Sequence, residues 1–249
     1  MIPSDRVKPY PLLSRVSAVL LVILLSACAS QPVTMTDPER DPWESYNRKM
    51  HAFNMGLDKA IFRPVAKGYD TIMPDAPQRG VRNFFNNLAY PVVFLNLLFQ
   101  GRFKDSLTAT GRFLLNTTGG LLGFFDVASK EGIPDYDEDF GQTVAVWGWK
   151  DSRYLVMPVF GPFTVRDLLG RSFYGRAHPL SYYSRKHNYW PVVGDLITRR
   201  AALLPFDDDI KNAHDPYTLI RDAYLQRREF LIYNGDPPAP DYDALLEDF

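Results

Sequence analysis

The chain lacks most of the features by which enzymes and nucleic-acid-binding proteins are recognised from sequence. Its 249 residues include one cysteine, Cys28, which excludes an intramolecular disulfide. Charge of one sign is not in excess, since 28 lysines and arginines stand against 29 aspartates and glutamates. Phosphate binding usually shows as a basic excess or a basic stripe, so we expect no nucleic-acid partner.

Motifs for metal, nucleotide and covalent chemistry are also missing. The four histidines have no metal-ligand spacing, so we expect no metal site, and no other motif indicates a cofactor. The run from Gly119 to Gly123 lacks the lysine and hydroxyl residue of a phosphate-binding loop. The run from Gly170 to Gly175 has one residue too many for a nucleophile elbow. We therefore do not expect an enzyme.

Residues 1–27 have the layout of a secretory signal peptide. Arg6, Lys8 and Arg15 precede an uncharged stretch of ten residues, Val16–Leu25, that is apolar except for Ser17. A helix of that length rises about 15 Å, half of the hydrocarbon thickness of about 30 Å, so the stretch alone spans a bilayer poorly. We expect it to direct export rather than to anchor the mature protein.

The end of that stretch resembles a bacterial lipobox. Residues 25–28 read Leu-Ser-Ala-Cys, which implies cleavage before Cys28 and acylation of that cysteine. Several acyl chains make a stable membrane anchor. In lipoproteins of this kind an aspartate directly after the cysteine often retains the protein in the inner membrane, and Ala29 in that place favours the outer membrane.

The remaining sequence divides into three parts. Residues 28–40 are polar and contain proline, as in a tether. Residues 41–234 contain the helical patterns, and we expect them to form a single domain. Residues 235–249 contain three prolines and five acidic residues with no basic residue, which is typical of a flexible acidic tail.

Capping signals and apolar spacing predict several helices. Asp41-Pro42 predicts a helix start, and the apolar stripe that follows is expected to pack in the core until Arg63-Pro64 ends the pattern. The stripe is formed by Trp43, Tyr46, Met50, Phe53 and Leu57. Near the other end of the domain, Asp215-Pro216 predicts a helix to about Tyr233, and Asn234-Gly235 predicts its stop.

The middle of the domain gives weaker signals. Residues 78–89 and 91–101 are expected as two helical pieces divided at Pro91. A further stripe runs from Phe103 to Leu115, where Gly111 would let a neighbouring backbone approach closely. Residues 143–147 and 154–160 are rich in β-forming residues and are expected as short strands or extended links.

Two long segments carry no charge. Residues 84–101 are uncharged over eighteen positions and residues 113–125 over thirteen. Polar and turn-forming residues interrupt both, so neither spans a membrane. The second centres on Gly119-Gly120 and predicts the tip of a helical hairpin. Either segment would fit the lipid interface or a buried core, and periodicity does not distinguish these alternatives.

The sequence resembles the MlaA (VacJ) family of lipoproteins over most of the chain. The shared blocks stand in the family's order: residues 41–48 (DPWESYNR), 63–66 (RPVA), 83–88 (NFFNNL), 112–119 (RFLLNTTG), 124–128 (FFDVA), 139–143 (DFGQT), 160–162 (FGP) and 165–167 (VRD). The chain departs from the family at Asp151–Tyr154, in place of a Gly-Pro-Tyr turn, and at Gly120–Gly123, in place of a Gly-Leu-Gly-Gly run.

The resemblance implies a single all-α domain shaped as a ring, with a central amphipathic channel, in the inner leaflet of the outer membrane. It also implies a role: mislocalised phospholipid leaves the outer leaflet through the channel and passes to the soluble periplasmic carrier MlaC, which maintains lipid asymmetry. Trimeric outer-membrane porins are implied partners. The alternative is a structural, porin-associated lipoprotein without transport activity.

Candidate functional residues follow from these patterns. The uncharged hairpin is expected to border the channel, with Gly119 and Gly120 as hinges, through Phe113, Leu114, Leu115, Gly119, Gly120, Leu121, Leu122, Phe124 and Phe125. Asn47 and Arg48, which lie in a family block, are candidates for contact with a lipid head group. Arg221, Arg227 and Arg228 on the last helix are candidates for contact with the carrier.

Overall fold

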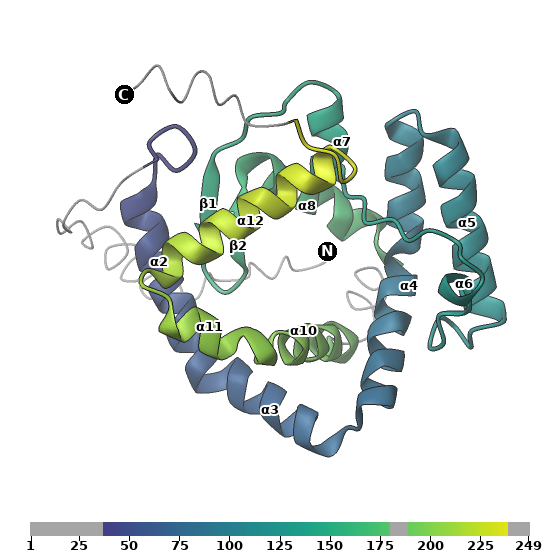
Figure 1. The fold of residues 1–249 in the computed structure, drawn as a ribbon, viewed down its shortest axis with the longest axis horizontal. Coiled ribbons are helices and arrows are strands. Elements are labelled where there is room, and N and C mark those ends of the chain that lie inside the picture. The colour runs from purple at the N-terminus through teal and green to yellow at the C-terminus, as the bar shows by residue number, and fades with distance from the viewer. Residues whose placement is uncertain (1–36, 180–188, 239–249) are drawn as a thin grey trace, which may run out of the picture. The chain divides into compact units, whose positions relative to one another are not determined.

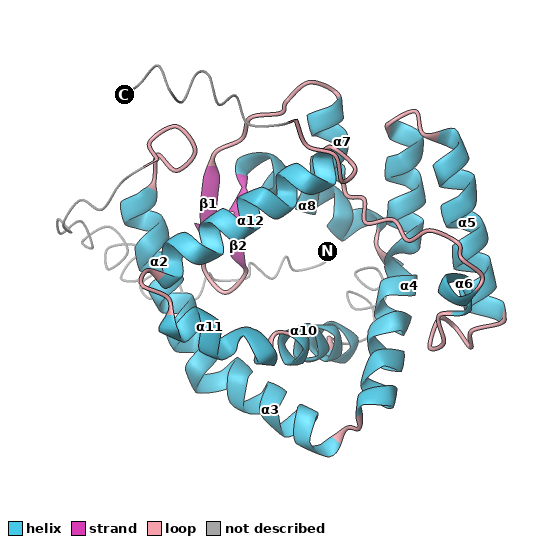
Figure 2. Ribbon diagram, in the orientation of Figure 1, coloured by secondary structure: helices cyan, strands magenta, loops and turns pink. Residues whose placement is uncertain are grey.

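The computed structural model describes residues 37–179 and 189–238, and within these the side chains of residues 172–177 are not described. Cys28, the signal peptide, most of the tether and the tail from residue 239 therefore lie outside the described residues. The elements, shown in Figures 1 and 2, are α2 (Glu44–Leu57), the π-helical η1 (Asp58–Phe62), α3 (Arg63–Ile72), α4 (Asp75–Phe99), α5 (Phe103–Thr118), α6 (Val127–Lys130), α7 (Phe140–Val146), β1 (Tyr154–Met157), β2 (Gly161–Thr164), α8 (Val165–Ala177), α10 (Trp190–Ala202), the 3₁₀ turn η2 (Leu204–Phe206), α11 (Asp207–Asn212) and α12 (Pro216–Ile232).

The predicted all-α class is confirmed, with one small exception. The strands β1 and β2 form an antiparallel hairpin in which Tyr154 pairs with Thr164 and Met157 with Gly161. Of the two segments rich in β-forming residues, 154–160 therefore contains a strand, as expected, over residues 154–157. The other segment was predicted wrongly, because residues 143–146 belong to α7. The Asp139 carboxylate accepts from the backbone N–H of Gln142 and so caps that helix, a local bond that outweighs β propensity.

Helix α2 continues through η1 into α3, so the predicted break at Arg63-Pro64 is wrong. Proline normally disturbs a helix because its ring meets the carbonyl four residues earlier. Here the five-residue π-helical η1 directly precedes Arg63. A π turn shifts the hydrogen bonds to the residue five positions back. Pro64 then lies in the first turn of α3, where a missing N–H does little harm.

Helix α4 also passes through its proline, contrary to the predicted division at Pro91. Its C-terminal part packs against α5, and the two helices form the hairpin seen at the side of Figure 1. Val93 and Leu97 on α4 are buried with Ala109 on α5. The burial of residues on the C-terminal side of Pro91 stabilises the helix against the local cost of the missing hydrogen bond, which is about 3 kcal/mol.

The apolar stripes point away from the interior. Trp43 (44% exposed), Tyr46 (42%) and Phe53 (52%) are open on the surface of α2, whereas Glu44 and Asn47 are buried. The prediction that this stripe forms the core is therefore wrong for these three residues. Leu57 is half-buried, and Met50 packs against the buried cluster of Tyr154, Val156 and Tyr217. The stripe of α5 behaves alike, since Phe103 and Leu107 are exposed.

The buried face of α5 consists of Ser106, Ala109, Arg112 and Asn116. Gly111 is exposed and no atom lies within 4 Å of a Cβ built there, so the predicted close backbone approach is also wrong. The apolar spacing correctly identified which residues share a helix face. It did not show whether that face points to the interior or to the surface.

Candidate functional site

The segment 113–125 forms the end of α5 and a tight loop. After α5 ends at Thr118, the backbone N–H of Leu122 donates to the Thr117 carbonyl (2.9 Å) and that of Gly123 to the Asn116 carbonyl (2.8 Å). Leu121 and Leu122 adopt left-handed backbone angles, with φ of 51° and 61°, and Gly123 follows with φ of 92°. The turn predicted here exists, but its second arm is only the short helix α6.

The loop presents apolar side chains outward. Leu121 (67% exposed) and Leu122 (62%) are open, as are Leu114 and Phe125, whereas Phe113, Leu115 and Phe124 are half-buried. Left-handed angles in two leucines are unfavourable in isolation. The loop bonds hold the backbone in this form, and the result is an exposed apolar edge.

The two candidate hinge glycines lie in different environments. A Cβ atom at Gly120 would overlap the carbonyl oxygens of Phe125 and Asn116, so only glycine permits that close approach. Gly119 follows α5 with helical backbone angles, and a Cβ there would lie 3.2 Å from the Leu115 carbonyl oxygen. Packing accounts for Gly120, and a hinge role for either glycine stays a prediction.

Polar side chains fasten this loop from behind. Arg112, 3% exposed, donates to the carbonyl of Ile133, to the carboxylate of Asp126 and to the hydroxyl of Ser129, each at 2.8 Å. Asn116 donates to Asp126 (3.0 Å) and accepts from the backbone N–H of Ala128 (2.9 Å). These bonds tie α5 to α6 and to the segment that follows it.

The same contacts set the charge of Asp126. Burial works to raise the pKa of this carboxyl group, but hydrogen bonds from Ser129 and Asn116 and the charge of Arg112 outweigh it and hold the pKa below its usual value. Asp126 is therefore ionised at neutral pH and forms a fixed pair with Arg112.

A small polar cavity lies between α4, α5 and the segment after α6. Its volume is about 80 Å³. Asn83, Asn86, Asn87 and Tyr90 line it from α4, and Arg112 and Asn116 line it from α5, with Asp126 and Asp135 completing the wall. From the same wall, Asn87 donates to Thr117 (2.9 Å) and to the carbonyl of Leu122 (3.4 Å), which joins the cavity to the apolar loop.

Asn47 is fully buried and joins α2 to β1. Its amide group donates to Asp41 (2.7 Å) and to the carbonyl of Tyr154 (3.2 Å), and its side-chain oxygen accepts from the backbone N–H of Val156 (2.8 Å). The geometry accounts for Asn47 as a connector between distant segments. Contact between this side chain and a head group stays a prediction.

Arg48 is held by two carboxylates. It donates to Glu44 (2.6 Å) and to both oxygens of Asp215 (3.1 and 2.8 Å), and its guanidinium lies 4.4 Å from the centre of the Tyr217 ring. The hydrogen bonds from Arg48 hold the pKa of Asp215 well below its usual range. Asp215 also caps α12, so Arg48 links α2 to the start of the last helix.

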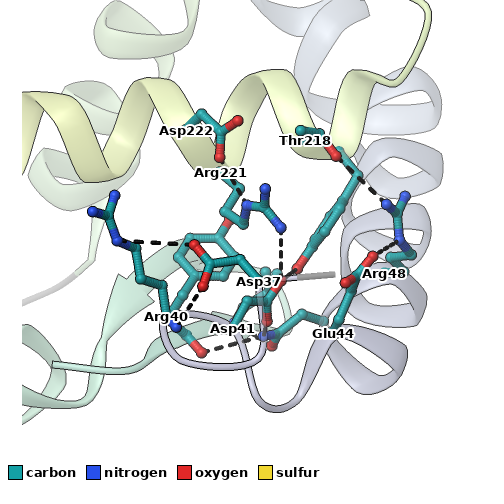
Figure 3. A network of polar contacts seen from close by, with 12 residues as sticks. Asp37, Arg40, Asp41, Glu44, Arg48, Thr218, Arg221 and Asp222 are labelled. Atoms are coloured by element: carbon teal, nitrogen blue, oxygen red, sulfur yellow. Dashed lines mark hydrogen bonds and ion pairs between the residues drawn. The ribbon is translucent and has the colours of Figure 1, made fainter. Parts of the chain in front are cut away.

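Figure 3 shows the polar network around Asp41 and Arg48, where α12 crosses the segment before α2. The buried Asp41 carboxylate accepts from the Tyr217 hydroxyl and from Arg221 (3.5 Å). Burial and the neighbouring Asp41 raise the pKa of Tyr217, which keeps the phenol protonated as a donor. The expected cap at Asp41 is thus a long-range contact instead, and α2 begins at Glu44.

The three arginines proposed for carrier contact differ in exposure. Arg221 and Arg228 are buried, and Arg228 pairs with Asp139 (2.5 and 3.0 Å) and Asp167 (2.8 Å). Arg227 points outward and pairs with the exposed Asp137 (3.0 Å). Of the three, only Arg227 has a side chain placed at the surface.

Sequence reasoning missed the interior role of Arg112, Asn87 and Asp126. A signal was present, because Arg112 and Asn116 lie four residues apart on the face opposite the apolar stripe of α5. Polar residues on one helix face usually indicate solvent, however, and not an interior network.

Two findings concern the membrane and metal chemistry. Within residues 37–179 and 189–238, no helix is both long and apolar enough to cross a bilayer. In the same ranges, no group of three or more histidine, cysteine or acidic side chains is placed to hold a metal ion.

The comparisons with known proteins agree with one another. Residues 39–231 match the model of the MlaA lipoprotein family. The intermembrane phospholipid transport system lipoprotein MlaA of Escherichia coli is 35% identical over 232 residues, which cover 89% of this chain and 90% of that protein. The protein of the same name from Haemophilus influenzae is 33% identical over 226 residues, which cover 88% of this chain and 90% of that protein.

A protein of Rickettsia prowazekii without an assigned role is 40% identical over 192 residues, 76% of each chain. A solved structure described as "Structural basis for maintenance of bacterial outer membrane lipid asymmetry" aligns with a TM-score of 0.69 and 33% identity. The alignment covers 77% of this chain and 98% of that one. The chain belongs to the MlaA lipoprotein family.

Proposed function

We propose that this protein is the outer-membrane lipoprotein of an Mla-type phospholipid transport system. It takes mislocalised phospholipid from the outer leaflet and passes it to the periplasmic carrier MlaC, and it catalyses no covalent reaction. Membership of the MlaA family, whose relatives bear the name of an intermembrane phospholipid transport system, is the observation on which this rests. The distribution of polar and apolar side chains supports it.

That distribution suits a protein surrounded by lipid. Large apolar side chains are exposed on α2, α5, α10 and the 121–125 loop, while asparagine, arginine and aspartate side chains are buried. Exposed apolar patches of this extent usually mark a membrane or a partner surface. We propose that the domain lies in one leaflet, anchored through the acylated Cys28 on the periplasmic side.

The segment 113–125 is the proposed border of the lipid path. A phospholipid has apolar chains and a polar head, so its path needs an apolar surface beside polar groups. The exposed Leu121 and Leu122 supply the first. The asparagines behind the loop, which bond to its carbonyls, supply the second. We propose that this edge faces an amphipathic channel enclosed by a ring of helices.

Partners complete the proposal. The exposed Arg227 is the proposed carrier contact on α12. Trimeric porins are proposed to hold the protein in place, as the family resemblance implies.

A transfer assay with reconstituted protein tests the proposal. Full-length acylated protein in vesicles with labelled phospholipid should release label to added MlaC, and vesicles without the protein should not. A photo-crosslinking residue at Leu122 should capture phospholipid, whereas one at the exposed Lys130 beyond the loop should not. Porin binding without any transfer of label would contradict transport and favour a purely structural lipoprotein.

A further inference from the structure

The cavity between α4 and α5 is rich in hydrogen-bond acceptors. One guanidinium, that of Arg112, faces two carboxylates, Asp126 and Asp135, so the wall has a formal charge of −1. The terminal nitrogens of Arg112 already donate to Asp126, Ser129 and Ile133. Its remaining nitrogen, Nε, lies 3.5 Å from Asp135. Among the residues that the structure describes, that Nε atom is buried and forms no hydrogen bond, and Asp135 is its ion-pair partner. The Asp135 carboxylate also accepts a hydrogen bond from the Tyr90 hydroxyl.

One acceptor in this wall has no partner. Asn87 is 5% exposed, and within the described part of the chain its side-chain oxygen forms no hydrogen bond, although its amide nitrogen is bonded to Thr117. A buried polar atom without a partner costs about 1–3 kcal/mol, so a donor that fills the cavity is favoured. At the mouth, Asp135 is 72% exposed and Asn86 is exposed. Two of the side chains that line the cavity therefore also reach solvent.

We infer that this cavity binds a primary ammonium group. An ammonium group carries three donors and one positive charge, which match the unpaired Asn87 oxygen, the exposed Asp135 carboxylate and the net charge of the wall. The volume of about 80 Å³ admits such a group with its neighbouring carbons, because one water needs only about 10–15 Å³ by a comparable measure.

Other cations fit less well. Recognition of a quaternary ammonium uses a cage of aromatic rings. Tyr90 is the one aromatic side chain in this wall, and its ring is already faced by the Arg112 guanidinium at 5.8 Å. A divalent metal ion needs several free carboxylate oxygens. Both oxygens of Asp126 already accept hydrogen bonds, and one oxygen of Asp135 accepts from Tyr90 and faces Arg112.

The surroundings of the cavity indicate the source of the ammonium group. The carbonyls of Leu122 and Phe124 accept from Asn87 and Asn83 on the cavity wall, each at 3.4 Å. Exposed apolar side chains of the same loop therefore lie next to the acceptors. This pairing suits an aminophospholipid such as phosphatidylethanolamine, and for this source the inference rests on the proposed function. A free alkylamine has the same ammonium chemistry.

Competition between two lipids tests the inference. Full-length protein in detergent is offered equal amounts of phosphatidylethanolamine and phosphatidylglycerol with identical acyl chains, and the bound lipid is measured by native mass spectrometry. Asp135→Asn should lower the excess of bound phosphatidylethanolamine about tenfold. Asn86→Asp, which adds a carboxylate at the mouth, should raise it. Asp137→Asn is the matched control, because Asp137 is equally exposed (70%) and outside the cavity.

The outcomes separate the two proposals. A preference for phosphatidylethanolamine that is lost in Asp135→Asn and kept in Asp137→Asn supports the site with a lipid source. Saturable, Asp135-dependent binding of ethanolamine in a parallel titration, without any lipid preference, supports the site with a soluble source. Equal binding of both lipids and no binding of ethanolamine overturns the inference while leaving phospholipid transport intact. No bound phospholipid of either kind contradicts the proposed function itself.

Discussion

Gly170 of α8 lies against Gly141 of α7 so closely that a Cβ atom at position 170 would be 2.7 Å from the backbone nitrogen of Gly141. The two helices therefore meet backbone to backbone. The reverse substitution is no easier, because a Cβ at Gly141 would overlap the Asp167 carboxylate. The crossing places Asp139 and Asp167 where both reach Arg228.

Gly170→Ala should lower the free energy of unfolding by about 1–3 kcal/mol, because the added methyl group forces α7 and α8 apart. Gly111→Ala is the control: that glycine is helical with open space around it, and alanine should be neutral or stabilising by about 1 kcal/mol. Urea unfolding in detergent, followed by circular dichroism, measures both. Equal stability of the two variants would contradict the close crossing.

Arg228→Ala should destabilise the protein by about 3 kcal/mol, since it removes the cation that bonds both the buried Asp167 carboxylate and the partly exposed Asp139 carboxylate. Arg227→Ala, one position away and exposed, should change stability by no more than about 0.5 kcal/mol. A pull-down with MlaC should show the opposite ranking at equal amounts of folded protein: Arg227→Glu weakens capture. Unchanged capture would remove Arg227 from the carrier surface.

Arg48→Ala should lower stability by about 1–3 kcal/mol, because it removes the link between α2 and the cap of α12. Arg48→Lys should recover only part of this, since lysine cannot bond both oxygens of Asp215 in the same way. Lipid transfer per folded molecule then tests the head-group role. Normal lipid transfer by Arg48→Ala would contradict head-group contact and show that Arg48 only stabilises the fold.

Stability should fall as the pH is lowered from about 6.5 toward 4, partly through His178. Burial lowers the pKa of this side chain from 6.5 to about 4. Between these values the unfolded chain binds a proton that the folded protein does not, so acid favours unfolding. The contribution is about 2–3 kcal/mol in this window.

Unfolding free energies of His178→Asn across this pH range should show a shallower slope than those of the unsubstituted protein. His214→Asn, at an exposed position, should keep the original slope. A slope that is the same in all three proteins would show that His178 does not contribute.

All four tryptophans, Trp43, Trp147, Trp149 and Trp190, have exposed side chains. In vesicles containing brominated lipid their fluorescence should be quenched relative to ordinary lipid, since tryptophan favours the membrane interface. Trp190→Phe, at the most exposed of the four, should remove the largest share of the quenched signal. Emission that is insensitive to bromine would contradict a seat in the leaflet.

Local signals in the sequence predicted the fold better than long-range ones. Helix α12 was predicted almost to the residue, because Asp215 caps it through its own neighbours and Asn234-Gly235 ends it with left-handed angles. The joins at Pro64 and Pro91 were not predictable in this way. They depend on a π turn and on packing against α5, neither of which a single residue reveals.

The candidate site was predictable only as a segment. The uncharged run 113–125 indicated the turn and its apolar character. Which side of α5 is buried depends on what surrounds the protein, and Arg112 meets Ile133 and Asp126 through chain folding that periodicity does not encode. The long-range bond from Asn47 to Val156 is of the same kind.

On α2 most of the apolar stripe is exposed and the polar Asn47 is buried, so the polar position should tolerate substitution less than the apolar ones. Phe53 is exposed, so leucine or isoleucine should replace it with little loss of stability. Asn47, which both gives and receives hydrogen bonds across three partners, has no substitute of equal size and chemistry. Amino-acid substitutions should therefore accumulate fastest at the exposed apolar positions. They should accumulate slowest at the buried asparagines and arginines.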